Sequence, residues 1–64
     1  MQTDFERKEW YVYIIETESG NVIDEMGPMY EREAEQVRRG ISINLNYDEY
    51  HIDVDEGRRE RTYL

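Results

Sequence analysis

A chain of 64 residues forms one domain at most, and folding removes only about 60% of the surface of so short a chain from water. It contains no cysteine, so disulfides and thiolate metal sites, the usual supports of very small domains, are excluded. Sixteen acidic and eight basic residues give a formal charge of −8, which favours basic partners and argues against direct nucleic-acid binding.

The N-terminal residues 1–10 mix charges of both signs and lack the apolar run of a signal peptide. No segment approaches the ~20 consecutive apolar residues that a membrane span needs. Together these features predict a cytoplasmic protein with no membrane partner.

Residues 10–16, WYVYIIE, are aromatic and β-branched and contain no breaker, which is typical of a central strand that is apolar on both faces. Residues 19–21, SGN, predict a turn, and residues 22–26, VIDEM, a return strand that completes a hairpin. The pair Gly27-Pro28 is expected to end this strand, because proline cannot donate to a strand ladder.

A helix is expected soon after the proline. Its apolar positions fall in one narrow stripe, which consists of Tyr30, Ala34, Val37, Ile41 and Leu45. Gly40 leaves two alternatives: a helix that runs to about Leu45, or one that ends at Gly40 and is followed by strand-like alternation over 41–45. The longer helix is preferred, because Ile41 and Leu45 continue the stripe.

The last element has the alternation of a strand with one buried and one solvated face. Its apolar positions are Tyr50, Ile52 and Val54, and its polar positions are His51, Asp53 and Asp55. Residues 57–64 then lose apolar content, so we expect an ordered core over about 9–56 and a mobile tail over 57–64 unless something binds it.

These elements predict an α+β fold of a single domain over 1–64. In this ββαβ arrangement, one helix packs on one face of a three-stranded, mostly antiparallel sheet. Strand order 2-1-3 is favoured, because a strand that is apolar on both faces belongs in the middle. The rival is order 1-2-3 with a parallel, right-handed crossover.

The sequence gives little support for catalysis. His51 beside Asp53 could do acid–base chemistry, but no cysteine nucleophile exists and the serines lie in the turn and the helix region. The acidic run from Asp53 to Gly57 lacks the spacing of a calcium loop, and no glycine-rich phosphate motif is present. We expect no enzyme activity, no cofactor and no metal.

Basic residues are concentrated near the C-terminus, where Arg58, Arg59 and Arg61 could contact a phosphate or an acidic partner. Exposed charges on a flexible segment, interspersed with Glu56 and Glu60, more often have no specific role. The interpretation that these arginines have no specific role is preferred.

A partner surface is predicted on the sheet, because one helix covers one face while the first strand is apolar on both. The predicted open side carries Tyr11, Tyr13 and Ile15, with His51, Asp53 and Asp55 as a polar rim. Asp24 and Ile43 complete the expected partner-binding set, since Ile43 would project away from the core side of a continuous helix. Alternatively, the tyrosines lie on a solvated sheet, or the segment around Phe5 folds over them.

The run GPMYEREAEQVRRGISINLN followed by YDEYHIDVD resembles small proteins found in phages of actinobacteria and other bacteria, over about residues 10–55. That family has a strand hairpin, a Gly-Pro turn, a helix of the type ERxAExV and an INLN segment, and it has no established activity. Tyr30 departs from it, since such sequences tend to have a helix-capping serine there. The resemblance implies a phage accessory protein, a class that often antagonises host machinery.

The first functional hypothesis is therefore a non-enzymatic protein in the host cytoplasm that binds and inhibits a host protein with a basic surface. Its carboxylates would imitate the charge of nucleic acid against a nucleic-acid-handling or defence protein. The alternative is a small structural or regulatory homodimer that associates through the open sheet face. The acidity could also serve solubility alone.

Overall fold

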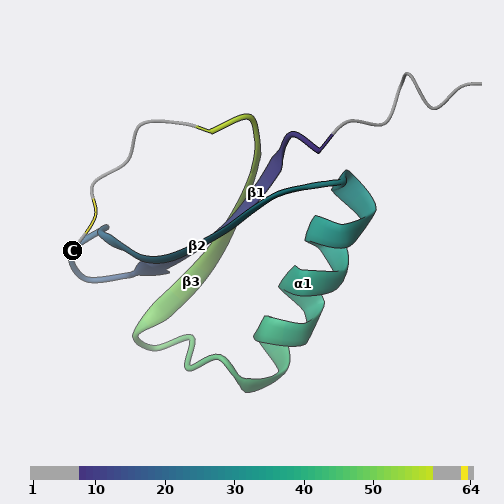
Figure 1. The fold of residues 1–64 in the computed structure, drawn as a ribbon. Helices are drawn as coiled ribbons and strands as arrows, with labels where there is room; N and C mark the ends of the chain where they lie inside the picture. The colour runs from purple at the N-terminus through teal and green to yellow at the C-terminus, as the bar shows by residue number, and fades with distance from the viewer. Residues whose placement is uncertain (1–7, 59–62, 64) are drawn as a thin grey trace, which may run out of the picture.

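The computed structural model describes residues 8–58 and residue 63. Its elements are β1 (Trp10–Glu16), β2 (Val22–Met29), α1 (Glu31–Asn44) and β3 (Tyr50–Glu56). The three strands form one sheet in the order β2-β1-β3, and β1 is antiparallel to both neighbours (Figure 1). The predicted α+β class, the ββαβ order and the central place of the first strand are confirmed.

Strand β2 is longer than the sequence predicted. The expectation that it ends at Gly27-Pro28 is wrong, because pairing with β1 continues to Met29, which lies opposite Trp10. The register shifts between the Val12↔Met26 and Trp10↔Met29 pairs, so the Gly-Pro pair lies in an irregularity of the ladder. Proline is tolerated there because β2 is an edge strand and a bulge leaves a residue without a ladder partner.

Helix α1 follows directly and includes Gly40, so the longer of the two predicted helices is confirmed. The side chain of Glu33 accepts a hydrogen bond from the backbone N–H of Tyr30 at 3.0 Å, which stabilises the first turn in place of the serine cap. Ala34 is the fully buried member of the predicted stripe, and the other four are half-buried. The small side chain of Ala34 lets the helix approach the sheet closely.

Replacing Gly40 by alanine should stabilise the protein by about 0.5–1 kcal/mol, because alanine loses less backbone entropy in a helix. A Cβ at this position would meet no atom within 4 Å, so no clash opposes the gain. Chemical denaturation of the two proteins measures the difference. A loss of stability would show that the helix does not continue through residue 40.

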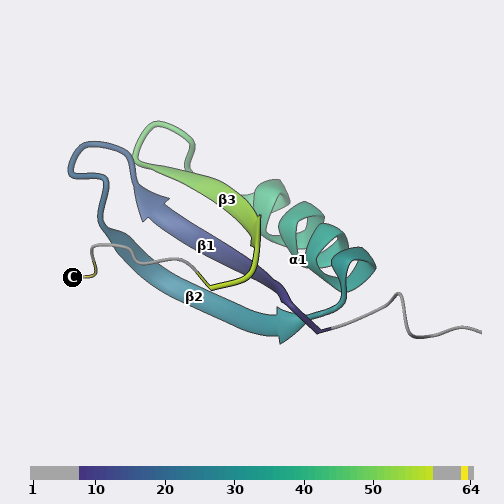
Figure 2. The same cartoon turned by 90° about the horizontal axis from the view of Figure 1, so that it is seen from above.

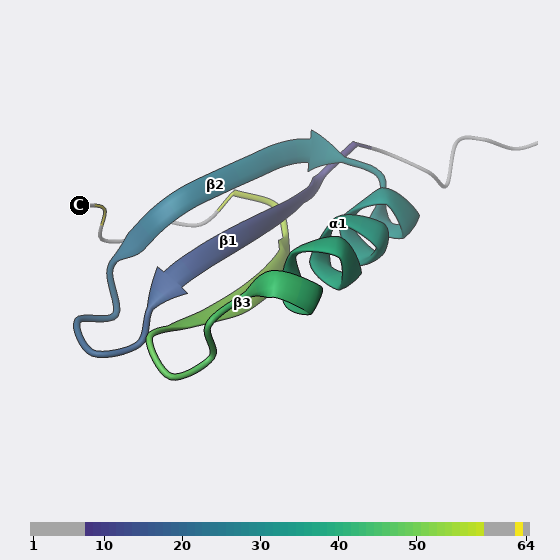
Figure 3. The ribbon, with the colours of Figure 1, turned by 90° about the horizontal axis from the view of Figure 1, so that it is seen from below.

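The helix and the turn directly after β3 lie on opposite faces of the sheet. Viewed from above and below, α1 lies against one face, while residues 57–58, directly after β3, turn toward the other (Figures 2 and 3). Gly57 makes this turn with a φ of +79°, a conformation that favours glycine, and its N–H donates to the carbonyl of Glu9. Helix α1 therefore lies on one face of β1, while Arg58 and Tyr63 reach Glu25 on the other.

Candidate functional site

One face of the sheet gathers the residues that the sequence singled out. Strand pairing places Asp55 opposite Tyr11, Asp53 opposite Tyr13 and His51 opposite Ile15. Directly paired residues project to the same side of a sheet, so these six share one face. Glu25 of β2 lies opposite Tyr13 and joins them. We call this set, with Glu25 included, the tyrosine face.

The expectation that this face lies open is wrong. Tyr13 is 0% exposed and Ile15 is 5% exposed, and both pack with Val22 in a core cluster that Tyr11 borders. Tyr13 and Ile15 therefore offer no surface to a partner in this state. The physical reason is that a short chain gains about 25 cal/mol for each Å² of apolar surface it covers, and Arg58 and Tyr63 lie on this face, where they bind Glu25.

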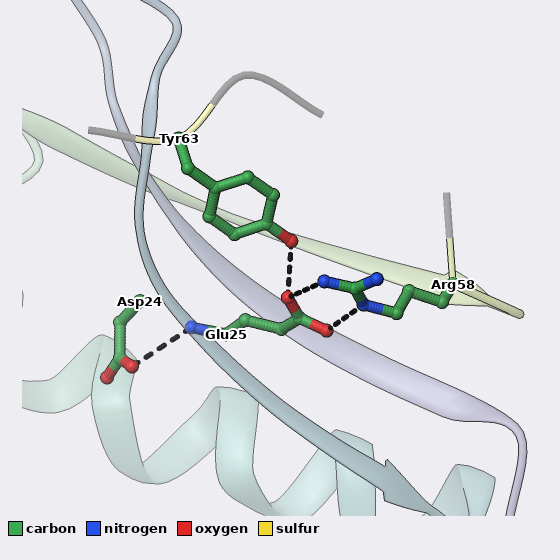
Figure 4. Close-up of polar contacts among 4 residues, drawn as sticks. All are labelled: Asp24, Glu25, Arg58 and Tyr63. Carbon is green, nitrogen blue, oxygen red and sulfur yellow. Dashed lines mark hydrogen bonds and ion pairs between the residues drawn. The ribbon is translucent and has the colours of Figure 1, made fainter. Parts of the chain in front are cut away.

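Glu25 is the polar centre of the tyrosine face. Its carboxylate accepts hydrogen bonds from Arg58 Nε at 2.8 Å and Arg58 Nη2 at 3.3 Å, one on each oxygen. The hydroxyl of Tyr63 donates to the same carboxylate from another side (Figure 4). A guanidinium that engages both carboxylate oxygens is geometrically specific in a way that a lysine contact is not.

The described residues of the C-terminal segment are thus attached to the sheet. Tyr63 also forms a parallel β-bridge with Val22, next to the point where β2 begins. The interpretation that Arg58 has no specific role is wrong, because a bidentate pair with Glu25 is a defined contact. Arg59 and Arg61, and the expected mobility of the tail over 59–62 and 64, lie outside the described residues, as does Phe5.

The contact with Glu25 changes the protonation behaviour of Tyr63. Its hydrogen bond to the carboxylate, then partial desolvation and the nearby negative charge, raise the pKa of the phenol above its ordinary value. A raised pKa means that the folded protein favours the protonated phenol. The resulting stabilisation is complete below the ordinary phenol pKa of about 10 and is lost as the pH rises through the raised value.

The remaining predicted site residues are placed elsewhere or have other contacts. Asp24 lies opposite Ile14, on the face that α1 covers, so it does not join the tyrosine face. Ile43 is 79% exposed on the helix, which confirms that it projects away from the core. His51 Nδ1 lies 3.2 Å from Thr17 Oγ1, and this contact ties the end of β1 to the start of β3.

A second acidic surface, which the sequence did not single out, lies at one end of the sheet. The β1–β2 turn and the loop before β3 meet there, because the Thr17 N–H donates to the Glu49 carbonyl at 2.8 Å. A depression of about 220 Å³ is lined there by the end of β1 and by both of these segments, through the acidic residues Glu16, Glu18, Asp48 and Glu49. We call these four residues the acidic end. No ion pair between residues that the structure describes involves any of them.

The comparisons and the remaining chemistry give no further assignment. The chain matches no protein-family model, no characterised protein and no solved structure. Within residues 8–58 and 63, no group of three or more metal-ligating side chains is placed to hold an ion. In the same residues, no helix is long and apolar enough to cross a membrane.

Proposed function

We propose that the protein is a non-enzymatic accessory protein of the phage type that binds a basic surface of a host protein and inhibits it. The observation that carries the proposal is the acidic end, where four carboxylates from two segments surround one depression. Opposite charge at such a surface would speed association with a basic protein and select against acidic ones.

The distribution of charge supports this proposal. The residues outside the described part, 1–7, 59–62 and 64, contain three acidic and three basic side chains. The whole formal charge of −8 therefore belongs to residues 8–58 and 63. A partner with a basic, nucleic-acid-handling surface would therefore meet a small body with a net negative charge.

Capture of host proteins from a bacterial lysate on the immobilised protein tests the proposal. We expect the captured partner to leave as the ionic strength rises, and to leave when duplex DNA is added, because DNA competes for the same basic surface. Retention at high salt and in the presence of DNA would contradict charge mimicry.

Neutralising the acidic end should reduce this capture. The variant Glu16→Gln/Glu18→Gln/Asp48→Asn/Glu49→Gln removes four charges, one from the end of β1 and three from exposed turn and loop positions. Its matched control is Glu31→Gln/Glu33→Gln/Asp24→Asn/Glu56→Gln, which removes four charges from exposed positions elsewhere. We expect the first variant to lose the partner and the control to keep most of it. Equal loss from both variants would mean that net charge alone, rather than the acidic end, attracts the partner.

A homodimer through the tyrosine face is the second candidate. It requires that Arg58 and Tyr63 leave Glu25, since Tyr13 and Ile15 are buried in the single chain. Sedimentation at micromolar concentration separates the candidates, because a monomer at that concentration removes the homodimer.

A further inference from the structure

We propose that Arg58 and Tyr63 are a built-in ligand of the tyrosine face, and that an extended partner segment carrying an arginine and a tyrosine binds the same place after displacing them. This second interface differs from the acidic end. It stands whether or not the acidic end binds a host protein.

The first support is the chemistry at Glu25. The Glu25 side chain is 19% exposed, whereas the Arg58 side chain that binds it is 61% exposed. The carboxylate is therefore held in the surface of the sheet, and the guanidinium approaches it from the solvent side. A guanidinium on another chain could make the same two hydrogen bonds, because this geometry belongs to the carboxylate and needs no covalent connection.

The second support is the edge of the sheet. Strand β2 is an edge strand, and the isolated bridge between Val22 and Tyr63 shows that its outer side pairs in parallel with the backbone of one further residue. Adding an extended peptide to an exposed strand edge is a common mode of peptide recognition, in which the backbone supplies affinity and side chains supply specificity. Here Tyr63 makes both the backbone bridge and the side-chain contact.

The third support is the connection of the ligand to the sheet. Arg58 follows β3 after one glycine, so only one residue separates this part of the ligand from the sheet. A short connection gives an attached ligand an effective concentration of about millimolar. A foreign segment therefore competes with the attached one. It binds the intact protein more weakly than it would bind a tyrosine face that Arg58 and Tyr63 had left.

A synthetic peptide with the sequence of residues 57–64, GRRERTYL, tests the proposal on the full-length chain. We expect negligible binding to the wild type at micromolar concentration, because the attached segment occupies the site. The variant Arg58→Gln/Tyr63→Phe should bind the peptide about tenfold or more tightly than the wild type, because its own segment has lost two groups that engage Glu25. Fluorescence anisotropy of the labelled peptide measures both affinities.

Two controls separate this site from general attraction to a negative protein. A scrambled peptide of the same composition should bind the variant no better than it binds the wild type. A peptide with glutamine and phenylalanine at the positions of Arg58 and Tyr63 should not show the increased affinity for the variant. This control changes only the peptide and leaves the folded protein as it is. The proposal would be overturned if GRRERTYL bound the wild type and the variant with equal affinity. It would also be overturned if either control peptide showed the same increase in affinity for the variant as GRRERTYL does. A wild-type dimer in sedimentation would also overturn it, because the segment would then bind a second copy.

Discussion

Replacing Tyr13 by alanine is expected to destabilise the protein by about 3–5 kcal/mol, the range found when large buried aromatic side chains are truncated in other proteins. Tyr13 is 0% exposed and is one of the largest fully buried side chains. A chain of this length has a total stability of only about 3–10 kcal/mol, so the variant should be partly or wholly unfolded at room temperature. Far-ultraviolet circular dichroism and urea titration measure the loss.

The control is Tyr47→Ala, which truncates the same type of side chain at a loop position that is 56% exposed. Its effect should stay within about 0.5 kcal/mol, as for most surface substitutions. If the two variants lost similar stability, Tyr13 would not be buried, and the closure of the tyrosine face would be wrong.

Replacing Gly27 by alanine is the second change with a large expected effect, a loss of about 2–4 kcal/mol from backbone strain and overpacking. Gly27 has a φ of +134°, which side-chain-bearing residues rarely adopt. An added Cβ would lie 2.7 Å from the carbonyl oxygen of Trp10 and 2.8 Å from Cδ2 of Tyr11. Either β2 moves away from β1 or the Tyr11 ring leaves its place, and urea denaturation reports the loss.

Gly20→Ala separates the two contributions. Gly20 also has a positive φ, of +76°, but no atom lies within 4 Å of the Cβ position. Its substitution should cost only the backbone term, about 1–2 kcal/mol. If Gly27→Ala were as stable as Gly20→Ala, or more stable, then β2 would not lie as close to β1 as the structure places it.

Much of the fold could be predicted because it follows from local patterns. The alternation of Tyr50, Ile52 and Val54 with polar residues predicts β3, and the two-sided apolar character of residues 10–16 places β1 in the centre. Given those two strands, the grouping of the tyrosines with His51, Asp53 and Asp55 on one face follows from antiparallel pairing, and the register confirms it.

The rest depends on contacts between residues far apart in the chain. Arg58 meets Glu25 across 33 positions and Tyr63 meets it across 38, and no local periodicity signals either contact. The three C-terminal arginines signal only that an acidic partner would fit. For Arg58, this partner is Glu25 of the same chain. The contact depends on the turn at Gly57, and no hydrophobic pattern in the sequence predicts that turn. The place of Pro28 within β2 is hard to predict for a related reason, since a proline is acceptable only once a strand is known to be at an edge.

Closure of the tyrosine face by Arg58 and Tyr63 is tested most directly by proton–proton contacts in the nuclear magnetic resonance spectrum of the free protein. The structure predicts contacts between the backbone protons of Val22 and Tyr63, and between the Tyr63 ring and the side chain of Glu25. In Glu25→Gln these contacts should weaken while those between β1 and β3 persist. If the wild-type spectrum lacked the contacts of Tyr63 with Val22 and Glu25, the face would not be closed by its own chain.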